Sequence, residues 1–229
     1  MKILKITFVL ILFFSAHIFS QSLSIGLGSG LNFINGNNYY TDNFGRLGIY
    51  ENINGTTTNL TGLGLSRELQ FKFGAKYSFE NLPLSLTAGL NYLHLRGNES
   101  MYIYDVFMQR EFLKDVTTKM DIWSFQMGTN YFFSFYFLKP FVAASVSINY
   151  FDDVFIELAE TDYTSEFRSY KNGMRYGYSL GMGISYNIFS NIELEFSTNY
   201  NSWNVFHRRE AEEMLNSVNA LVNIYYKIL

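Results

Sequence analysis

The feature that most constrains this chain is the alternation of apolar and small residues between residues 174 and 187. The apolar row consists of Met174, Tyr176, Tyr178, Leu180, Met182, Ile184 and Tyr186. The residues between them are Gly, Ser or Asn, apart from Arg175. Because side chains in a strand point alternately to opposite faces, this pattern predicts a long β-strand whose two faces meet different surroundings.

The same alternation recurs seven more times, which predicts eight strands. They cover residues 23–33, 69–79, 84–92, 123–133, 142–150, 174–186, 192–200 and 218–228. Short turns are expected at 80–83, 134–140 and 188–191, and long polar connections at 35–66, 97–120, 152–172 and 201–216. The 23 Phe, 18 Tyr and 17 Gly, with only 2 Pro, also favour strands. We therefore expect an all-β fold, an eight-stranded antiparallel up-and-down barrel.

The placement of charged residues indicates which row faces outward. The apolar rows contain no Lys, Arg, Asp or Glu, and a Lys or Arg facing the middle of a bilayer costs roughly 2 to 4 kcal/mol. The opposite rows hold the strand charges among Gly, Ser and Asn, which are small enough for the interior of eight strands. This favours a transmembrane barrel with its apolar rows in lipid over a soluble barrel with those rows around a ligand.

The first 20 residues predict a cleaved secretory signal peptide. Lys2 and Lys5 accompany an apolar stretch from Ile6 to Phe14, and small and polar residues follow up to Ser20. The stretch is too short to cross a bilayer as a helix, which takes roughly 20 apolar residues. We expect residues 1–20 to be removed and residues 21–229 to form the barrel domain.

These features resemble the small outer-membrane β-barrel superfamily of Gram-negative bacteria that includes OmpX and the barrel half of OmpA. Such barrels have short periplasmic turns and longer external loops. Residues 223–229 resemble the C-terminal strand that the barrel-assembly machinery of these families recognises, although Ile228 and Leu229 replace the usual terminal aromatic residue. The resemblance implies an outer-membrane location, contact with lipid and lipopolysaccharide, and a monomer; a fold alone does not transfer an activity.

Charged residues on the inward rows predict a cluster of ion pairs in the lumen. They are Lys72, Lys76, Arg175, Glu193, Glu195 and Lys227. Buried charges have to be paired and hydrogen-bonded, so this cluster predicts a plugged lumen. A narrow gated channel is the alternative. An OmpW-like passage for small apolar solutes also stays open, because the inward rows include Leu93, Leu95, Phe132, Leu221 and Tyr225.

Two external segments are candidate interaction sites. Alternation continues through Tyr102 and Tyr104, which predicts a protruding hairpin with an unpaired edge that can recruit an extended strand from a surface or secretion-system protein. The third external connection is acidic and contains Asp152, Asp153, Glu157 and Glu160. Because no EF-hand spacing is present, a hydrated acidic surface is preferred to a Ca²⁺ or Mg²⁺ site.

The chain offers few residues for catalysis or for cofactors. It has no Cys, which excludes a lipoprotein anchor, a disulfide and a thiolate metal site. Beyond the leader only His94 and His207 remain, and lipid A deacylases of the PagL type pair their His with a Ser two residues on, where this chain has Arg96. The net charge of −3, without a basic patch, disfavours nucleic-acid binding. We expect a structural or interaction barrel without enzyme activity, cofactor or metal; a lipid-modifying enzyme is the third hypothesis.

Overall fold

The computed structural model describes most of the chain after residue 20. The described residues are 21–35, 49–52, 55–58, 68–79, 81–105, 110–133, 137–152, 154–159, 164–169, 172–208 and 214–228. Their regular structure consists of twelve strands, β1 to β12. No helix within these ranges is long and apolar enough to cross a membrane.

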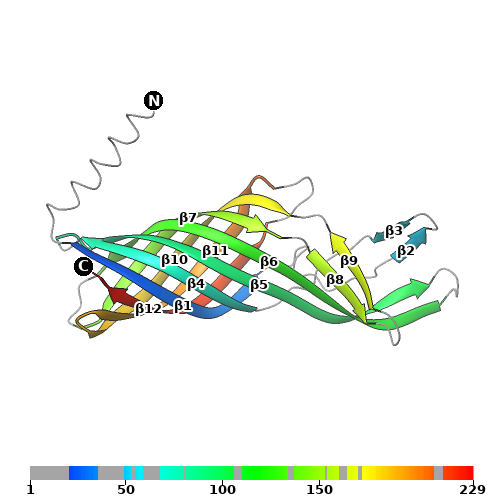
Figure 1. Ribbon diagram of the computed structural model, residues 1–229, viewed down its shortest axis with the longest axis horizontal. Helices are drawn as coiled ribbons and strands as arrows, with labels where there is room; N and C mark the ends of the chain where they lie inside the picture. The colour runs from blue at the N-terminus through cyan, green and yellow to red at the C-terminus, as the bar shows by residue number, and fades with distance from the viewer. Residues whose placement is uncertain are drawn as a thin grey trace, which may run out of the picture.

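Eight of the strands close into an antiparallel up-and-down barrel (Figure 1). Around the barrel each strand pairs with the next one along the chain, and the last pairs with the first. The predicted eight-stranded antiparallel barrel is therefore confirmed. In order they are β1 (Gln21–Asn35), β4 (Glu68–Phe79), β5 (Leu84–Asp105), β6 (Arg110–Phe132), β7 (Lys139–Phe151), β10 (Gly173–Phe189), β11 (Ile192–Phe206) and β12 (Asn216–Lys227).

Three short turns join barrel strands at one end of the molecule, which we call the turn end. They lie between β4 and β5, between β6 and β7, and between β10 and β11, as predicted. One detail of the prediction is wrong, because Lys139 and Pro140 begin β7 instead of ending the turn. Proline is tolerated as an early residue of a strand, and the Pro140 carbonyl accepts a hydrogen bond of 2.8 Å from the Phe133 N–H.

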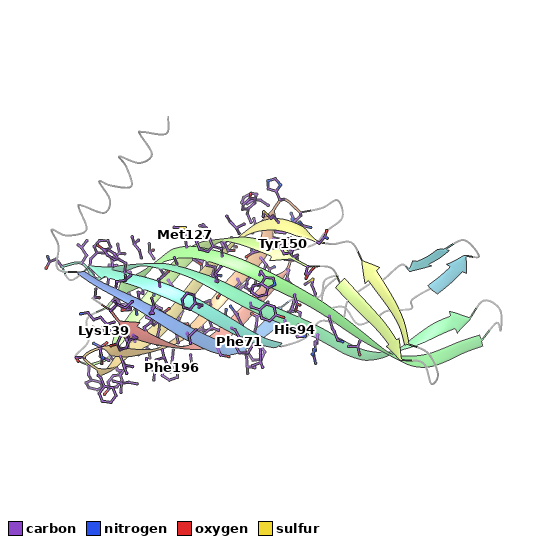
Figure 2. The ribbon with its side chains drawn as sticks, viewed as in Figure 1. Phe71, His94, Met127, Lys139, Tyr150 and Phe196 are labelled. Atoms are coloured by element: carbon purple, nitrogen blue, oxygen red, sulfur yellow. The ribbon has the colours of Figure 1, made fainter. Side chains whose placement is uncertain are left out.

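The barrel is apolar outside and polar inside. Outward side chains such as Leu27, Val146 and Met182 are 69%, 66% and 62% exposed, and Figure 2 shows Phe71, Met127, Tyr150 and Phe196 along the outer wall. Inward side chains such as Gln70 and Asn219 are almost completely buried. This distribution is the reverse of that in a protein surrounded by water and suits a barrel surrounded by lipid. The predicted outward orientation of the apolar rows is confirmed.

Inward glycines make room for large inward side chains on neighbouring strands. The Tyr225 ring of β12 lies over Gly26 of β1, where an added Cβ would be 2.5 Å from a ring carbon. Asn149 of β7 crosses over Gly177 of β10, where an added Cβ would be 2.9 Å from the Asn149 side-chain nitrogen. The glycines of the inward rows therefore allow the lumen to be filled from adjacent strands.

Residues 97–120, expected as a long polar connection, form mostly regular β structure. The register of β5 and β6 continues without a break from Leu84 opposite Tyr131 to Asp105 opposite Arg110. At about 3.3 Å per residue a strand as long as β5 extends about 70 Å, whereas a membrane crossing takes only about 9–11 residues. The β5–β6 hairpin therefore projects well beyond the barrel, at what we call the hairpin end (Figure 1).

Two smaller hairpins accompany the β5–β6 hairpin. Strands β8 (Val154–Ala159) and β9 (Thr164–Ser169) pair with each other, and β8 also pairs with β6 near Lys119. Strands β2 (Ile49–Asn52) and β3 (Gly55–Thr58) form a separate two-stranded sheet. Both lie toward the hairpin end in Figure 1.

Strand β11 also extends further than predicted, to Phe206 instead of Tyr200. A register shift between β10 and β11 occurs beside Tyr176 and Tyr178, and four consecutive residues, Asn201 to Asn204, are all buried. Such an irregularity interrupts the period of two, which is why the alternation does not reveal this part of the strand.

A charged residue on the outer wall is expected to destabilise the barrel. Val146→Arg, near the middle of β7, should lower the free energy of unfolding by about 2 to 4 kcal/mol, because the guanidinium would face the bilayer core. Urea titration in phosphatidylcholine vesicles measures this change, and Val146→Leu serves as the apolar control. An arginine variant as stable as the leucine variant would contradict the lipid-facing position of this wall.

Candidate functional site

The lumen near the turn end contains an ion-pair cluster centred on Lys76. The Lys76 side chain is 1% exposed, and its Nζ lies 2.5 Å from Glu193 Oε1 and 3.4 Å from Glu195 Oε2. Lys76 comes from β4 and the two glutamates from β11, with β1 and β12 between these strands in the sheet. The ion pairs therefore join strands that do not pair with each other.

Neighbouring groups complete the surroundings of these charges. Ser185 Oγ donates to Glu193 Oε1, and Asn223 Nδ2 donates to Glu195 Oε1 at 3.4 Å. The Lys76 Nζ also lies 4.4 Å from the centroid of the Tyr225 ring, a cation–π contact. The buried lysine is thus paired and hydrogen-bonded, as burial of a charge requires.

The structure brings together only part of the set of charges expected in the lumen. Lys76, Glu193 and Glu195 are in contact, and Lys72 lines the same interior cavity as Glu195. Lys227 is exposed at the turn end.

Arg175 lies elsewhere in the lumen, toward the hairpin end. It is 3% exposed, and its guanidinium carbon is 5.8 Å from the centroid of the Phe151 ring. Alternation predicts the face on which a side chain lies, whereas its height along the barrel depends on the register of all eight strands. For this reason, only three of the six charged residues predicted to point inward form a cluster in the structure, and a fourth lies nearby.

Side-chain amides cross the middle of the lumen in a hydrogen-bonded row. Gln70 Nε2 donates to Asn91 Oδ1 at 3.3 Å, Asn219 Nδ2 donates to Gln70 Oε1 at 2.9 Å, and Asn199 Nδ2 donates to Asn219 Oδ1 at 2.8 Å. The polar cavity beside them has a volume of about 40 Å³. At about 10 to 15 Å³ for each water molecule, this cavity holds about three waters.

The hairpin end of the lumen is filled by an apolar cluster, which we call the apolar plug. Its seven residues are each at most 1% exposed: Leu93, Leu95, Met120, Ile122, Phe151, Trp203 and Leu215. Trp203 Nε1 donates to Ser217 Oγ at 2.8 Å, and the side chain of Asn149 in β7 donates to the Trp203 carbonyl in β11. Hydrogen bonds therefore fix the largest member of the plug from two sides.

Sequence reasoning found only part of the apolar plug. It identified Leu93 and Leu95 as inward, but it placed Trp203 and Leu215 in a connection. The available signal was the presence of these two large apolar residues in an otherwise polar segment. In the structure the Trp203 N–H donates to the Leu215 carbonyl at 3.0 Å, and Asn204 Oδ1 accepts from the Leu215 N–H at 2.6 Å.

A second polar cluster lies on the outer wall, on the outward faces of β5 and β6. His94 Nδ1 is 2.5 Å from Asp121 Oδ1, Tyr92 OH donates to the same oxygen at 3.1 Å, and Arg96 Nε donates to His94 Nε2 at 2.7 Å. Both ring nitrogens of His94 are therefore hydrogen-bonded. Sequence reasoning missed Asp121 because the predicted strand began at Trp123.

Four of the six candidate interaction residues are described, and they lie at the hairpin end. Tyr102 and Tyr104 belong to β5, which beyond Leu93 pairs only with β6 among the described residues. Asp152 is half-buried after β7, and Glu157 lies in β8. Asp153 and Glu160 lie outside the described residues. In the ranges that the structure covers, no group of three or more His, Asp or Glu residues is arranged to hold a metal ion.

No protein-family model and no curated protein matches this sequence. Among solved structures, the chain is similar to Neisserial surface protein A, at 12% identity, over 90% of this chain and 98% of that one, with a TM-score of 0.49. It is also similar to the outer membrane protease OmpT from Escherichia coli, at 9% identity, over 90% and 95% of the chains, with a TM-score of 0.44. For the attachment invasion locus protein Ail of Yersinia pestis the values are 10%, 91%, 97% and 0.40. The chain itself has the closed eight-stranded architecture expected of the small outer-membrane barrels.

Proposed function

We propose that this protein is an outer-membrane β-barrel with a sealed lumen, which acts as a structural or interaction module through its hairpin end. The observation that carries this proposal is the filling of the lumen at two heights. The apolar plug occupies the hairpin end, and the Lys76 cluster occupies the turn end. A solute would have to displace both.

The outer-membrane location is supported by the apolar outer wall and by the predicted leader. A closed barrel leaves no unpaired edge within the bilayer, which lipid requires. Cleavage after residue 20 would leave β1 near the new N-terminus, and the barrel-assembly machinery would insert the chain from the periplasm with the turn end facing inward. The long hairpins would then lie outside the cell, as in other barrels of this kind.

A sealed lumen accounts for the interior better than a channel or a passage for apolar solutes. The interior cavity has a volume of only about 40 Å³, and its lining includes polar and charged side chains such as those of Asn199, Ser197 and Glu195 beside Phe141 and Leu221. A cavity this small and this polar does not suit an apolar solute. Of the apolar residues expected to border such a passage, Leu93 and Leu95 belong instead to the apolar plug, whereas Leu221 and Tyr225 line this cavity.

Two features of the β5–β6 hairpin, one at its base and one toward its tip, favour an interaction role over an enzymatic one. At its base, His94 has both ring nitrogens engaged by Asp121 and Arg96, so this histidine is not an open base. Toward its tip, β5 pairs only with β6 among the described residues, and the edge on its other side contains Tyr102 and Tyr104. An unpaired edge can bind an extended segment of another protein by strand addition.

Planar-bilayer recordings test the sealed lumen. The full-length mature barrel is expected to give no discrete conductance steps, because ions would have to pass both the apolar plug and the Lys76 cluster. A general porin inserted in the same bilayer controls for the sensitivity of the recording. Stable, stepwise conductance from the barrel would overturn the proposal in favour of a channel.

The contribution of the ion-pair cluster is tested by removing its cation. Lys76→Met should lower the free energy of unfolding by about 3 to 5 kcal/mol, because Glu193 and Glu195 would lose their buried partner. The triple variant Lys76→Met, Glu193→Gln, Glu195→Gln should recover most of this loss, since no unpaired charge remains. Lys139→Met, at an exposed lysine, is the matched control. Urea titration in vesicles measures all four proteins, and a Lys76→Met variant as stable as the control would show that the pairs contribute little.

A further inference from the structure

The β5–β6 hairpin loses both of its neighbouring strands at the same level of the barrel. The pairing of β4 with β5 ends at Leu93, the pairing of β7 with β6 ends at Ile122, and these two residues lie directly opposite each other. Strand β8 joins β6 only two pairs further on. Among the described residues, no third strand pairs with the hairpin over this short stretch, which we call the neck. The neck consists of two register pairs, His94 with Asp121 and Leu95 with Met120.

The neck is held from inside the barrel and from outside. On its inner face, Leu95 and Met120 belong to the apolar plug. On its outer face lies the polar cluster of the outer wall, and Figure 2 shows His94 toward the hairpin end of the barrel. We call this cluster the His94 network; its members are Tyr92, His94, Arg96 and Asp121. Apolar contacts carry no titratable group, so only the outer attachment can respond to protons.

The hydrogen bonds of the His94 network fix the protonation state of its histidine. The Nε–H of an arginine can only donate. Because Arg96 Nε donates to His94 Nε2 at 2.7 Å, this ring nitrogen carries no proton. The proton of the neutral ring is therefore on Nδ1, which donates to Asp121 Oδ1 at 2.5 Å. The observed network requires an uncharged imidazole in its Nδ1–H tautomer.

A second proton on His94 would break one link of the network and strengthen another. An imidazolium donates from both nitrogens, so Nε2 could no longer accept from Arg96, and the positive ring would repel the guanidinium. The hydrogen bond from Nδ1 to Asp121 would remain and would gain an opposite charge. Histidine is the side chain that ordinarily changes its charge between about pH 5 and pH 8. The network therefore has two arrangements that differ by one proton.

The groups around the network act on the charged ring in both directions. Beyond the network itself, the charged or titratable residues near His94 on this face, among those described, are Lys119 on β6 and Tyr150 and Asp152 at the end of β7. The carboxylates of Asp121 and Asp152 favour an imidazolium, whereas Arg96 and Lys119 oppose it. Arg96, Lys119 and Asp152 also have further interactions of their own. Protonation of His94 would thus remove one partner of Arg96 without leaving the arginine unpaired.

We propose that the His94 network is a proton-operated lock on the neck of the hairpin, closed while His94 is neutral and opened when it is protonated. In the closed state a chain of hydrogen bonds runs from Arg96 through His94 to Asp121 and joins β5 to β6 across the neck. Opening detaches the Arg96 end of this chain and leaves the outer face of the neck less firmly held. The inference deepens the interaction role proposed above and rests on it, because the neck carries the edge of β5 that contains Tyr102 and Tyr104.

Nitrogen NMR of the histidine rings tests the two states of the lock. After residue 20 the chain has two histidines, His94 and His207. The mature barrel is labelled with nitrogen-15 histidine and placed in phosphatidylcholine nanodiscs, and His207→Gln identifies the two sets of signals. His94 is expected as the Nδ1–H tautomer at about pH 7.5 and with both nitrogens protonated at about pH 5. A proton on Nε2 at the higher pH, or a ring that does not change between the two, would overturn the lock.

Hydrogen–deuterium exchange measures the opening at the neck. After correction for the intrinsic effect of pH on exchange, the backbone amides of residues 94–96 should exchange about tenfold faster at about pH 5 than at about pH 7.5. This factor is the effect of losing one hydrogen bond to a charged group. The amide of Gly89, where β5 is paired with both β4 and β6, is the internal reference. Equal corrected rates at the two pH values would contradict the opening.

Two matched variants assign the response to one histidine. His94→Gln keeps a polar side chain of similar size but has no titratable ring, so its neck should exchange at the same corrected rate at both pH values. His207→Gln removes the other histidine of the mature chain and should keep the native response. A pH response that survives His94→Gln would overturn the lock.

Failure of the lock can be distinguished from failure of the proposed function. Ring NMR and amide exchange report only on the neck, whereas conductance reports on the lumen. A neck that ignores pH would leave the sealed interaction barrel in place, and a barrel that conducts ions would overturn the sealed lumen whatever the state of His94.

Discussion

The structure depends on the closure of eight strands around a narrow interior. In lipid every backbone N–H and C=O must find a partner within the protein, and a sheet meets this demand only when its first and last strands pair. Here β1 pairs with β12 over twelve residue pairs, from Ser24 opposite Lys227 to Asn35 opposite Asn216. Closure with eight strands leaves an interior that side chains can fill. The chemistry of the inward rows then decides whether the barrel can conduct.

Two kinds of side chain fill this interior, polar ones toward the turn end and apolar ones toward the hairpin end. Toward the turn end, polar groups are kept by mutual pairing, as in the contacts of Lys76 with Glu193 and Glu195. Toward the hairpin end, the side chains of the apolar plug are buried as in a soluble core, with Trp203 held by Asn149 and Ser217. Glycine makes both possible, because positions such as Gly26 and Gly177 leave room for Tyr225 and Asn149. The interior of an eight-stranded barrel is narrow enough for side chains of this kind to fill, whereas a wider barrel has a channel.

The outer wall is under a different physical constraint from the lumen. Lipid accepts any apolar side chain, so most outward residues need only be apolar. Outward residues that depart from this rule need another explanation. His94, Arg96 and Asp121 depart from it by being polar. These three residues lie close together on the adjacent strands β5 and β6, toward the hairpin end of the outer wall.

Alternation determined the strand number and the face of each side chain, because both follow from the period of two. The short turns between strands indicated antiparallel order, and the absence of charges from the apolar rows indicated which rows face lipid. The same alternation predicts that His94 points outward. It does not predict the contact of His94 with Asp121, because that contact depends on the register of β5 against β6. Only the tertiary structure could select Lys76, Glu193 and Glu195 from six inward charges and place Trp203 in the lumen behind an irregularity in β11. The physical reason is that alternation specifies the face of the strand on which a side chain lies. Contacts across the barrel depend on the position of each residue along the barrel axis, which is set by the pairing of all eight strands.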